Sequence, residues 1–139
     1  WIKVAVMGAD HKVGGNQDGA NGGYKMSVYN DKVEFEIRTA ANSAVLNRSV
    51  AGGTVIETDL WYHVVGVYSL EDGYIRTYVN GELDRELLTT EALGASPGPL
   101  MIGCEPFNTG SYNFNGVMDE VRVYDKALSA AEARYIANN

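Results

Sequence analysis

The sequence predicts an all-β fold, an antiparallel β-sandwich followed by one short C-terminal helix. Short runs of alternating apolar and polar residues recur about every ten residues, with turn residues between them. The chain has 16 glycines but 3 prolines, which suits many strands joined by tight turns. Strands do not alternate with long helical segments, so a parallel sheet is not expected.

Length and charge limit the kinds of function. The 139 residues form one domain large enough to bury a core. A formal net charge of -7 makes nucleic acid and anionic membranes poor partners, whereas cations and neutral ligands such as sugars remain suitable. Cys104 is the single cysteine, so no intrachain disulfide forms. No apolar stretch approaches the roughly 20 residues of a membrane helix, and we expect no membrane insertion.

The first half of the chain contains a strand, a long loop and a hairpin. Residues 1–7 are apolar and β-prone, and residues 8–23 form a glycine-rich loop. Residues 24–29 and 32–39 form a hairpin around Asn30-Asp31, a pair that tolerates positive φ. Two weaker strands are expected at 44–50 and 53–57.

The glycine-rich loop carries oxygen-bearing side chains at short spacing that could bind calcium, which takes six to eight oxygen ligands. The candidate ligands are Asp10, Asn16, Asp18 and Asn21. Their spacing matches no EF-hand, and Asp-Gly and Asn-Gly are also ordinary turn dipeptides. A solvated turn is therefore the alternative to a metal loop.

The second half begins with the clearest hairpin. Residues 61–70 and 73–80 are its strands, with a turn at 71–73. Asn80-Gly81 is the strongest short hairpin signal in the chain and leads into a strand at 82–88. A short strand at 100–104 lies between two loops.

Residues 117–124 alternate as a final strand. Val117, Val121 and Val123 share one face with Asp119. A carboxylate in such a row of valines is predicted to be buried, so it must be paired, hydrogen-bonded or bound to a metal. Ser129 and Glu132 then have the spacing of a capping box, which predicts the start of a short helix.

Three blocks of sequence resemble the laminin-G-like domains of the concanavalin A-like lectin/glucanase superfamily. They are G-V-M-D-E-V-R-V-Y with the following L-S-A-A-E, W-Y-H-V-V-G-V-Y with Y-I-R-T-Y-V-N-G-E-L, and P-L-M-I-G. Their order is that of the family, and they cover most of the chain after Trp61. The resemblance implies a single concanavalin A-like jelly roll over residues 1–139 that lacks one or two N-terminal strands of the family. It also implies a secreted or cell-surface location.

The resemblance implies a calcium ligand as well. Relatives of this fold use an aspartate at the position of Asp119, with backbone carbonyls from early strands, to hold a structural calcium. The alternative is that Asp119 accepts hydrogen bonds from backbone amides or pairs with a basic side chain.

Enzyme activity is not expected. Glycosidases of the superfamily carry an acidic motif on one strand, and retaining chemistry needs two carboxyl groups about 5 Å apart. Glu34 and Glu36 are the one same-face acidic pair on a convincing strand, but Arg38 stands where a third acid would follow. We interpret the pair as part of a solvated sheet face.

The predicted function is a non-catalytic, lectin-like or adhesion module that recognises a glycan or a protein surface. The candidate ligand-binding residues are Tyr74, Arg76, Asn80, Tyr112 and Asn113, because sugars stack on rings and hydrogen-bond to amide and guanidinium groups. One alternative is an assembly module that forms a homo-oligomer through an open sheet edge. Another is an inactive remnant of a glycoside hydrolase.

Overall fold

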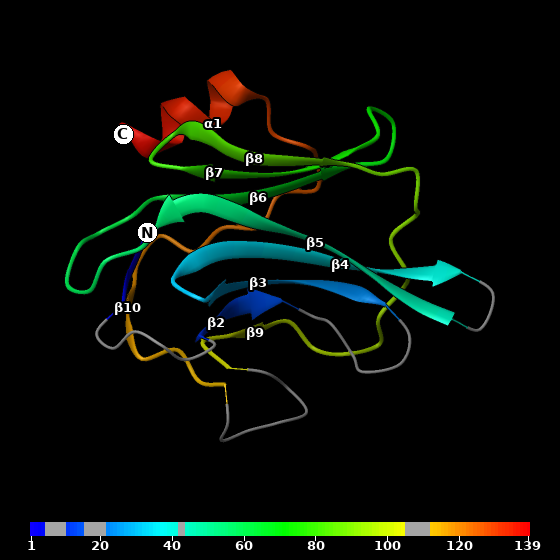
Figure 1. Ribbon diagram of the computed structural model, residues 1–139, viewed down its shortest axis with the longest axis horizontal. Helices are drawn as coiled ribbons and strands as arrows, with labels where there is room; N and C mark the ends of the chain where they lie inside the picture. The colour runs from blue at the N-terminus through cyan, green and yellow to red at the C-terminus, as the bar shows by residue number, and fades with distance from the viewer. Residues whose placement is uncertain (5–10, 16–21, 42–43, 105–111) are drawn as a thin grey trace.

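The computed structural model describes residues 1–4, 11–15, 22–41, 44–104 and 112–139. Within these residues the chain forms two sheets that face each other, a short additional ladder, and one helix (Figure 1). All strand pairs are antiparallel. No helix in this described part is long and apolar enough to cross a membrane.

The larger sheet has five strands in the order β5-β4-β3-β2-β9, and the smaller sheet has three in the order β6-β7-β8. The larger sheet consists of β5 (Ala44–Val55), β4 (Lys32–Ala41), β3 (Gly23–Tyr29), β2 (His11–Gly15) and β9 (Met101–Ile102). The smaller sheet consists of β6 (Val64–Ser69), β7 (Tyr74–Val79) and β8 (Glu82–Leu88). The additional ladder joins β1 (Ile2–Val4) to β10 (Gly116–Met118), and α1 (Ala130–Ala137) follows.

Turns with left-handed backbone set the register of the local hairpins. Asn30 and Asp31 have φ of 48° and 61°, the values that a two-residue hairpin turn requires, and β3 and β4 pair on either side. Asn80 and Gly81, with φ of 51° and 82°, join β7 to β8 in the same way. Both predicted hairpins are confirmed.

The core lies between the two sheets. Phe35 and Ile37 of β4 pack against Ile75 of β7 in one of three buried clusters. Gly66 of β6 makes this approach possible, because a Cβ atom there would lie 2.5 Å from the Phe35 ring. The ring and the β6 backbone are therefore in direct contact.

The helix packs on the smaller sheet. Leu128 and Ala133 are in contact with a cluster that contains Tyr74 and Tyr78. The predicted capping box is confirmed, since the Ser129 hydroxyl accepts a hydrogen bond from the N–H of Glu132 at 3.2 Å, and the Glu132 carboxylate accepts one from the N–H of Ser129 at 2.8 Å.

Strand β1 pairs on both of its sides. Ile2 exchanges two backbone hydrogen bonds of 2.8 Å with Tyr62, which lies just before β6, and on the other side Ile2 is opposite Met118 of β10. The ladder with β10 continues to Trp1, whose ammonium group donates to the carbonyl of Asp119 at 2.8 Å. The carbonyl of Trp1 accepts from the N–H of Asp119 at 3.0 Å.

Three predictions of element extent were wrong. Strand β2 lies inside the stretch predicted as a loop, because β3 and β9 supply hydrogen-bonding partners on both of its sides. The final strand ends at Met118 instead of residue 124, where Glu120 adopts a φ of 51°. Val121 and Val123 are 48% and 60% exposed. The weak strands predicted at 44–50 and 53–57 are one strand, β5.

The predicted burial of Asp119 was also wrong. Its side chain is exposed, and its carboxylate accepts a hydrogen bond from the N–H of Glu120 at 2.8 Å. The physical reason is that alternation buries a side chain where the strand has neighbours, and β10 pairs with β1 for just three residues.

Candidate functional site

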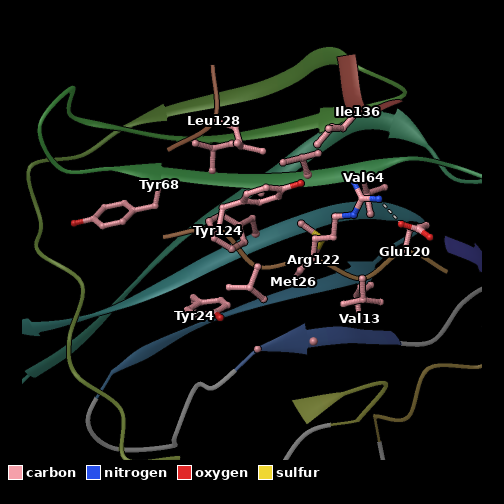
Figure 2. Close-up of a pocket in the computed structure, with 18 of the residues that line it drawn as sticks. Val13, Tyr24, Met26, Val64, Tyr68, Glu120, Arg122, Tyr124, Leu128 and Ile136 are labelled. Atoms are coloured by element: carbon pink, nitrogen blue, oxygen red, sulfur yellow. Dashed lines mark hydrogen bonds and ion pairs between the residues drawn. The ribbon is translucent and has the colours of Figure 1, made fainter. Parts of the chain in front are cut away.

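A cavity of about 640 Å³ lies between the two sheets and under residues 120–128, the segment that leads from β10 to α1 (Figure 2). Its volume falls within the range of ordinary ligand pockets. Three parts of the chain form its walls: the larger sheet, the edge of β6, and the 120–128 segment. This cavity is the candidate functional site.

Side chains of β3 and β4 form the wall on the larger sheet. Tyr24 and Met26 are half-buried and point into the cavity (Figure 2). The Tyr24 ring lies 6.4 Å from that of Phe35, in a tilted arrangement. This wall is mainly apolar, with one phenol group.

The second wall is β6 and the residues next to it. The Tyr68 hydroxyl donates a hydrogen bond to the carbonyl of Glu91 at 2.8 Å and accepts one from the N–H of Leu93 at 3.1 Å. Both bonds fix the ring at one end of the wall. Tyr68 therefore contributes its ring surface to the cavity, while its hydroxyl is already bonded to the chain.

The 120–128 segment supplies the polar rim. Arg122 forms an ion pair with Glu120, and both side chains are more than half exposed. Hydrogen bonds to Tyr124 and Glu120 raise the pKa of the Arg122 guanidinium, which keeps it charged. Tyr124 is 40% exposed and also lines the cavity.

His63 and Trp1 close one end of the cavity. The two rings meet edge to face, with centroids 5.4 Å apart, and His63 is buried. Burial lowers the pKa of His63, and the nearby Trp1 ammonium and Arg122 lower it further. His63 is therefore neutral at physiological pH, and its Nδ1 atom finds no hydrogen-bond partner among the described residues.

The predicted ligand-binding residues do not lie in this cavity. Tyr74 is buried beside α1, and the Arg76 guanidinium lies 3.6 Å from the centre of its ring while pairing with Glu86 at 2.5 Å. The carboxamide oxygen of Asn80 accepts a hydrogen bond from the N–H of His63 at 2.9 Å. Each of these three side chains therefore has a structural partner.

The other two predicted residues lie in the late loop. Tyr112 is half-buried and Asn113 is exposed. Neither is among the residues that line the cavity. Sequence reasoning missed four of the residues that line the cavity: Tyr24, Met26, Arg122 and Tyr124. Long-range packing brings them together. The alternation of the V-R-V-Y run had indicated a strand at Arg122 and Tyr124, but not a binding site.

Within the described residues, Asp119 is not joined by further acidic, histidine or cysteine side chains in a metal-binding group. No group of three or more His, Cys, Asp or Glu side chains that could hold a metal ion is found in this part of the chain. The Asp119 carboxylate accepts a hydrogen bond from the N–H of Glu120, and the Asp119 carbonyl accepts one from the amino group of Trp1. Asp10, Asn16, Asp18 and Asn21 lie outside the described residues.

The acidic pair on β4, Glu34 and Glu36, has ion-pair and hydrogen-bond partners within the sheet. Glu36 is buried and forms ion pairs with Lys25 at 3.4 Å and Arg38 at 3.5 Å. Glu34 accepts hydrogen bonds from the hydroxyls of Ser27, at 3.4 Å, and Ser49. The predicted solvated face is therefore a packed polar layer, and neither carboxylate lines the cavity.

Comparison with known proteins finds a curated relative of this chain. A curated relative, the adhesion G-protein coupled receptor V1 of Danio rerio, is 31% identical over 101 residues, which are 70% of this chain and 2% of the receptor. The chain thus spans a small fraction of the length of that relative.

Two solved structures share the fold. The CBM40 of a Ruminococcus gnavus IT-sialidase, bound to α2,3-sialyllactose, matches with a TM-score of 0.78 and 19% identity over 98% of this chain and 78% of that chain. The heptameric SAP-like pentraxin of Limulus polyphemus matches with a TM-score of 0.72 and 23% identity over 98% and 66% of the two chains. A laminin G family model matches residues 1–134, and the chain belongs to that family, within the concanavalin A-like lectin/glucanases superfamily.

Proposed function

We propose that this domain is a non-catalytic binding module that takes a carbohydrate or a protein segment into the cavity beneath residues 120–128. The observation that carries the proposal is the cavity itself. It opens to the surface, has tyrosines on more than one wall, and carries the charged Arg122–Glu120 pair on its rim. Apolar walls with a few polar groups are the usual composition of a ligand site.

A binding role is also supported by the fold. A protein with this fold binds α2,3-sialyllactose, so the scaffold is compatible with glycan recognition. Fold alone does not transfer a ligand, and the choice between ligand classes depends on the site. The adhesion receptor relative favours a secreted or cell-surface location for this domain.

We propose that the domain has no glycosidase activity, because its candidate catalytic carboxylates are held by hydrogen bonds and ion pairs. Retaining glycosidases need one carboxylate free to act as a nucleophile and a second one as acid and base. Glu34 and Glu36 are both engaged by neighbouring side chains on the sheet. Two carboxylates line the cavity, those of Glu120 and Asp125, and the carboxylate of Glu120 is paired with Arg122.

A glycan array with the purified domain tests the proposal, run with calcium and with a chelator. Tyr124→Ala removes an exposed rim ring and is expected to weaken binding about tenfold, the effect of losing one anchoring aromatic side chain. Tyr135→Ala is the matched control, because that tyrosine is 68% exposed on α1 and does not line the cavity.

The outcomes separate the parts of the proposal. Equal losses in both variants would place the ligand outside the cavity and contradict the assignment of the site. Binding that the chelator abolishes would support the predicted calcium requirement. Binding unchanged by the chelator would remove calcium from the account and leave the cavity as the site.

A further inference from the structure

We propose a second binding site, for a neutral saccharide, on the outer surface of the β1-β10 ladder. Its members are Trp61, Lys3, Val117 and Asp119. None of these four residues lines the cavity beneath residues 120–128. The inference therefore goes beyond the proposed function, and the two can be tested separately.

The backbone places three of these side chains in one row. Lys3 lies opposite Val117 in the β1-β10 ladder. On the other side of β1, Ile2 exchanges two hydrogen bonds with Tyr62, and antiparallel pairing then puts the next two residues, Lys3 and Trp61, opposite each other. Since Ile2 and Tyr62 are buried, alternation along each strand turns the row of three to the outer face.

The Trp61 ring is oriented by a neighbour and remains accessible. The residue is 42% exposed, although tryptophan has one of the largest apolar side chains. The Lys3 ammonium lies 5.7 Å from the centroid of the ring, near the outer limit of a cation–π contact. This contact orients the ring without burying it. A ring that is already oriented loses less conformational entropy when a ligand stacks on it.

A hydrogen-bond donor and an acceptor accompany the ring. The Lys3 ammonium carries N–H donors and forms no ion pair within the described residues. The backbone ladder continues from β10 to Asp119, so the exposed Asp119 side chain shares the face of Val117. One of its carboxylate oxygens accepts from the N–H of Glu120 at 2.8 Å. The other oxygen can accept a bond from a ligand hydroxyl.

The size and charge of this face indicate the class of ligand. Neighbouring strands lie about 4.8 Å apart, and residues on one face of a strand about 6.6 Å apart, so the four side chains cover roughly one or two sugar rings. A pyranose has an apolar face that stacks on Trp61 and hydroxyls that match Lys3 and Asp119. The charges of Lys3 and Asp119 cancel, and the formal net charge of -7 on the chain disfavours an acidic sugar.

The indole N–H signals in NMR spectra separate this site from the cavity. The chain has two tryptophans, Trp61 in the proposed site and Trp1 at one end of the cavity. The probes are cellotetraose, mannotetraose and galactotetraose, which are neutral, and 3′-sialyllactose, which is acidic, each added in millimolar excess to the intact domain. We expect a neutral probe to shift the Trp61 indole signal saturably, together with the amide signals of Lys3 and Val117.

Substitutions at Trp61 test the stacking contact. Trp61→Ala is expected to weaken binding of the neutral probe about tenfold, the effect of losing an anchoring aromatic side chain. Trp61→Tyr keeps a ring and should hold the affinity within about threefold of the wild type. Tyr135→Ala is the matched control, because it removes an aromatic side chain that is 68% exposed on α1, and it should leave the affinity unchanged. The shift of the Val117 amide gives the affinity in every variant.

A second variant keeps the test valid if Trp61→Ala does not fold, which circular dichroism checks. Lys3→Ala removes the N–H donors and the cation–π contact. It is expected to weaken binding about three- to tenfold, the effect of one or two hydrogen bonds.

Four results would overturn the inference. A shift of the Trp1 indole alone would leave the proposed function standing and remove the second site. A shift of neither indole with any probe would remove the second site and leave a protein segment as the ligand of the cavity. A response to 3′-sialyllactose alone would contradict the neutral class of ligand. Equal affinities of Trp61→Ala and Tyr135→Ala would contradict stacking on Trp61.

Discussion

At the scale of single residues, the contact between Gly66 and Phe35 sets the distance between the two sheets. An added Cβ atom at Gly66 would lie 2.5 Å from two atoms of the Phe35 ring and 2.9 Å from the end of the Met26 side chain. Phe35 itself is buried between the sheets. A methyl group at this position therefore has to displace the ring or the strand.

We expect Gly66→Ala to destabilise the domain by about 1–3 kcal/mol, the usual effect of overpacking a core. Urea unfolding followed by circular dichroism measures the loss. Gly53→Ala is the matched control, because a Cβ atom there meets its nearest neighbour at an ordinary 3.5 Å. If both variants unfold at the same urea concentration, the contact with Phe35 does not limit the packing.

His63 gives the second prediction at this scale. Its pKa is lowered by burial first, then by the Trp1 ammonium and by Arg122. The unfolded chain therefore binds a proton on this residue more readily than the folded chain does. Stability is expected to fall as the pH decreases through about 6.5, the unfolded value, and to stop falling from this cause below the folded pKa.

Thermal unfolding between pH 8 and pH 5 measures this dependence. His63→Gln should flatten the fall in melting temperature, whereas His11→Gln controls for the other histidine in the sequence. A pH dependence that His63→Gln leaves intact would assign the effect to another group.

At the scale of elements, the start of α1 is fixed by a small network of side chains. A hydrogen bond from Lys126, then bonds from the backbone and hydroxyl of Ser129, lower the pKa of Glu132 to about 2. Glu132 thus stays ionised down to that pH and holds the first turn from two sides. The stabilising effect is present above the ordinary glutamate pKa and is lost as the pH falls toward 2.

Ser129→Ala removes the side chain that caps the helix, and we expect it to cost about 1 kcal/mol of stability. Chemical unfolding at pH 7 provides the number. Ser129→Thr keeps a capping hydroxyl and should lose less than half as much. Should the threonine variant be as unstable as the alanine variant, the hydroxyl would not be the stabilising group.

At the scale of the whole molecule, features set by neighbouring residues in the sequence could be predicted, whereas features set by distant residues could not. The turns at Asn30-Asp31 and Asn80-Gly81 and the capping box at Ser129 were predictable, because each is a local backbone requirement that particular residue types satisfy. The sandwich fold was predictable from short strands with turn residues between them, and the family from three sequence blocks in the family's order.

What could not be predicted depends on partners distant in the chain. Strand β2 is held by β3 and by β9, and no alternation in its own residues marks it as a strand. Residues 121–124 alternate well yet remain outside a sheet, because alternation describes the side chains of a strand but does not supply its neighbour. The cavity was missed for the same reason, since its walls meet only after the sheets have formed.

The pairing of β1 with β10 has a consequence for the order of folding. The hairpins β3-β4, β4-β5, β6-β7 and β7-β8 each close a short loop, whereas the β1-β10 ladder brings Ile2 to Met118. Loop-closure entropy delays contacts between segments far apart in sequence until local structure has shortened the effective loop. We therefore expect the local hairpins to form before the β1-β10 ladder, which joins the two segments farthest apart in the sequence.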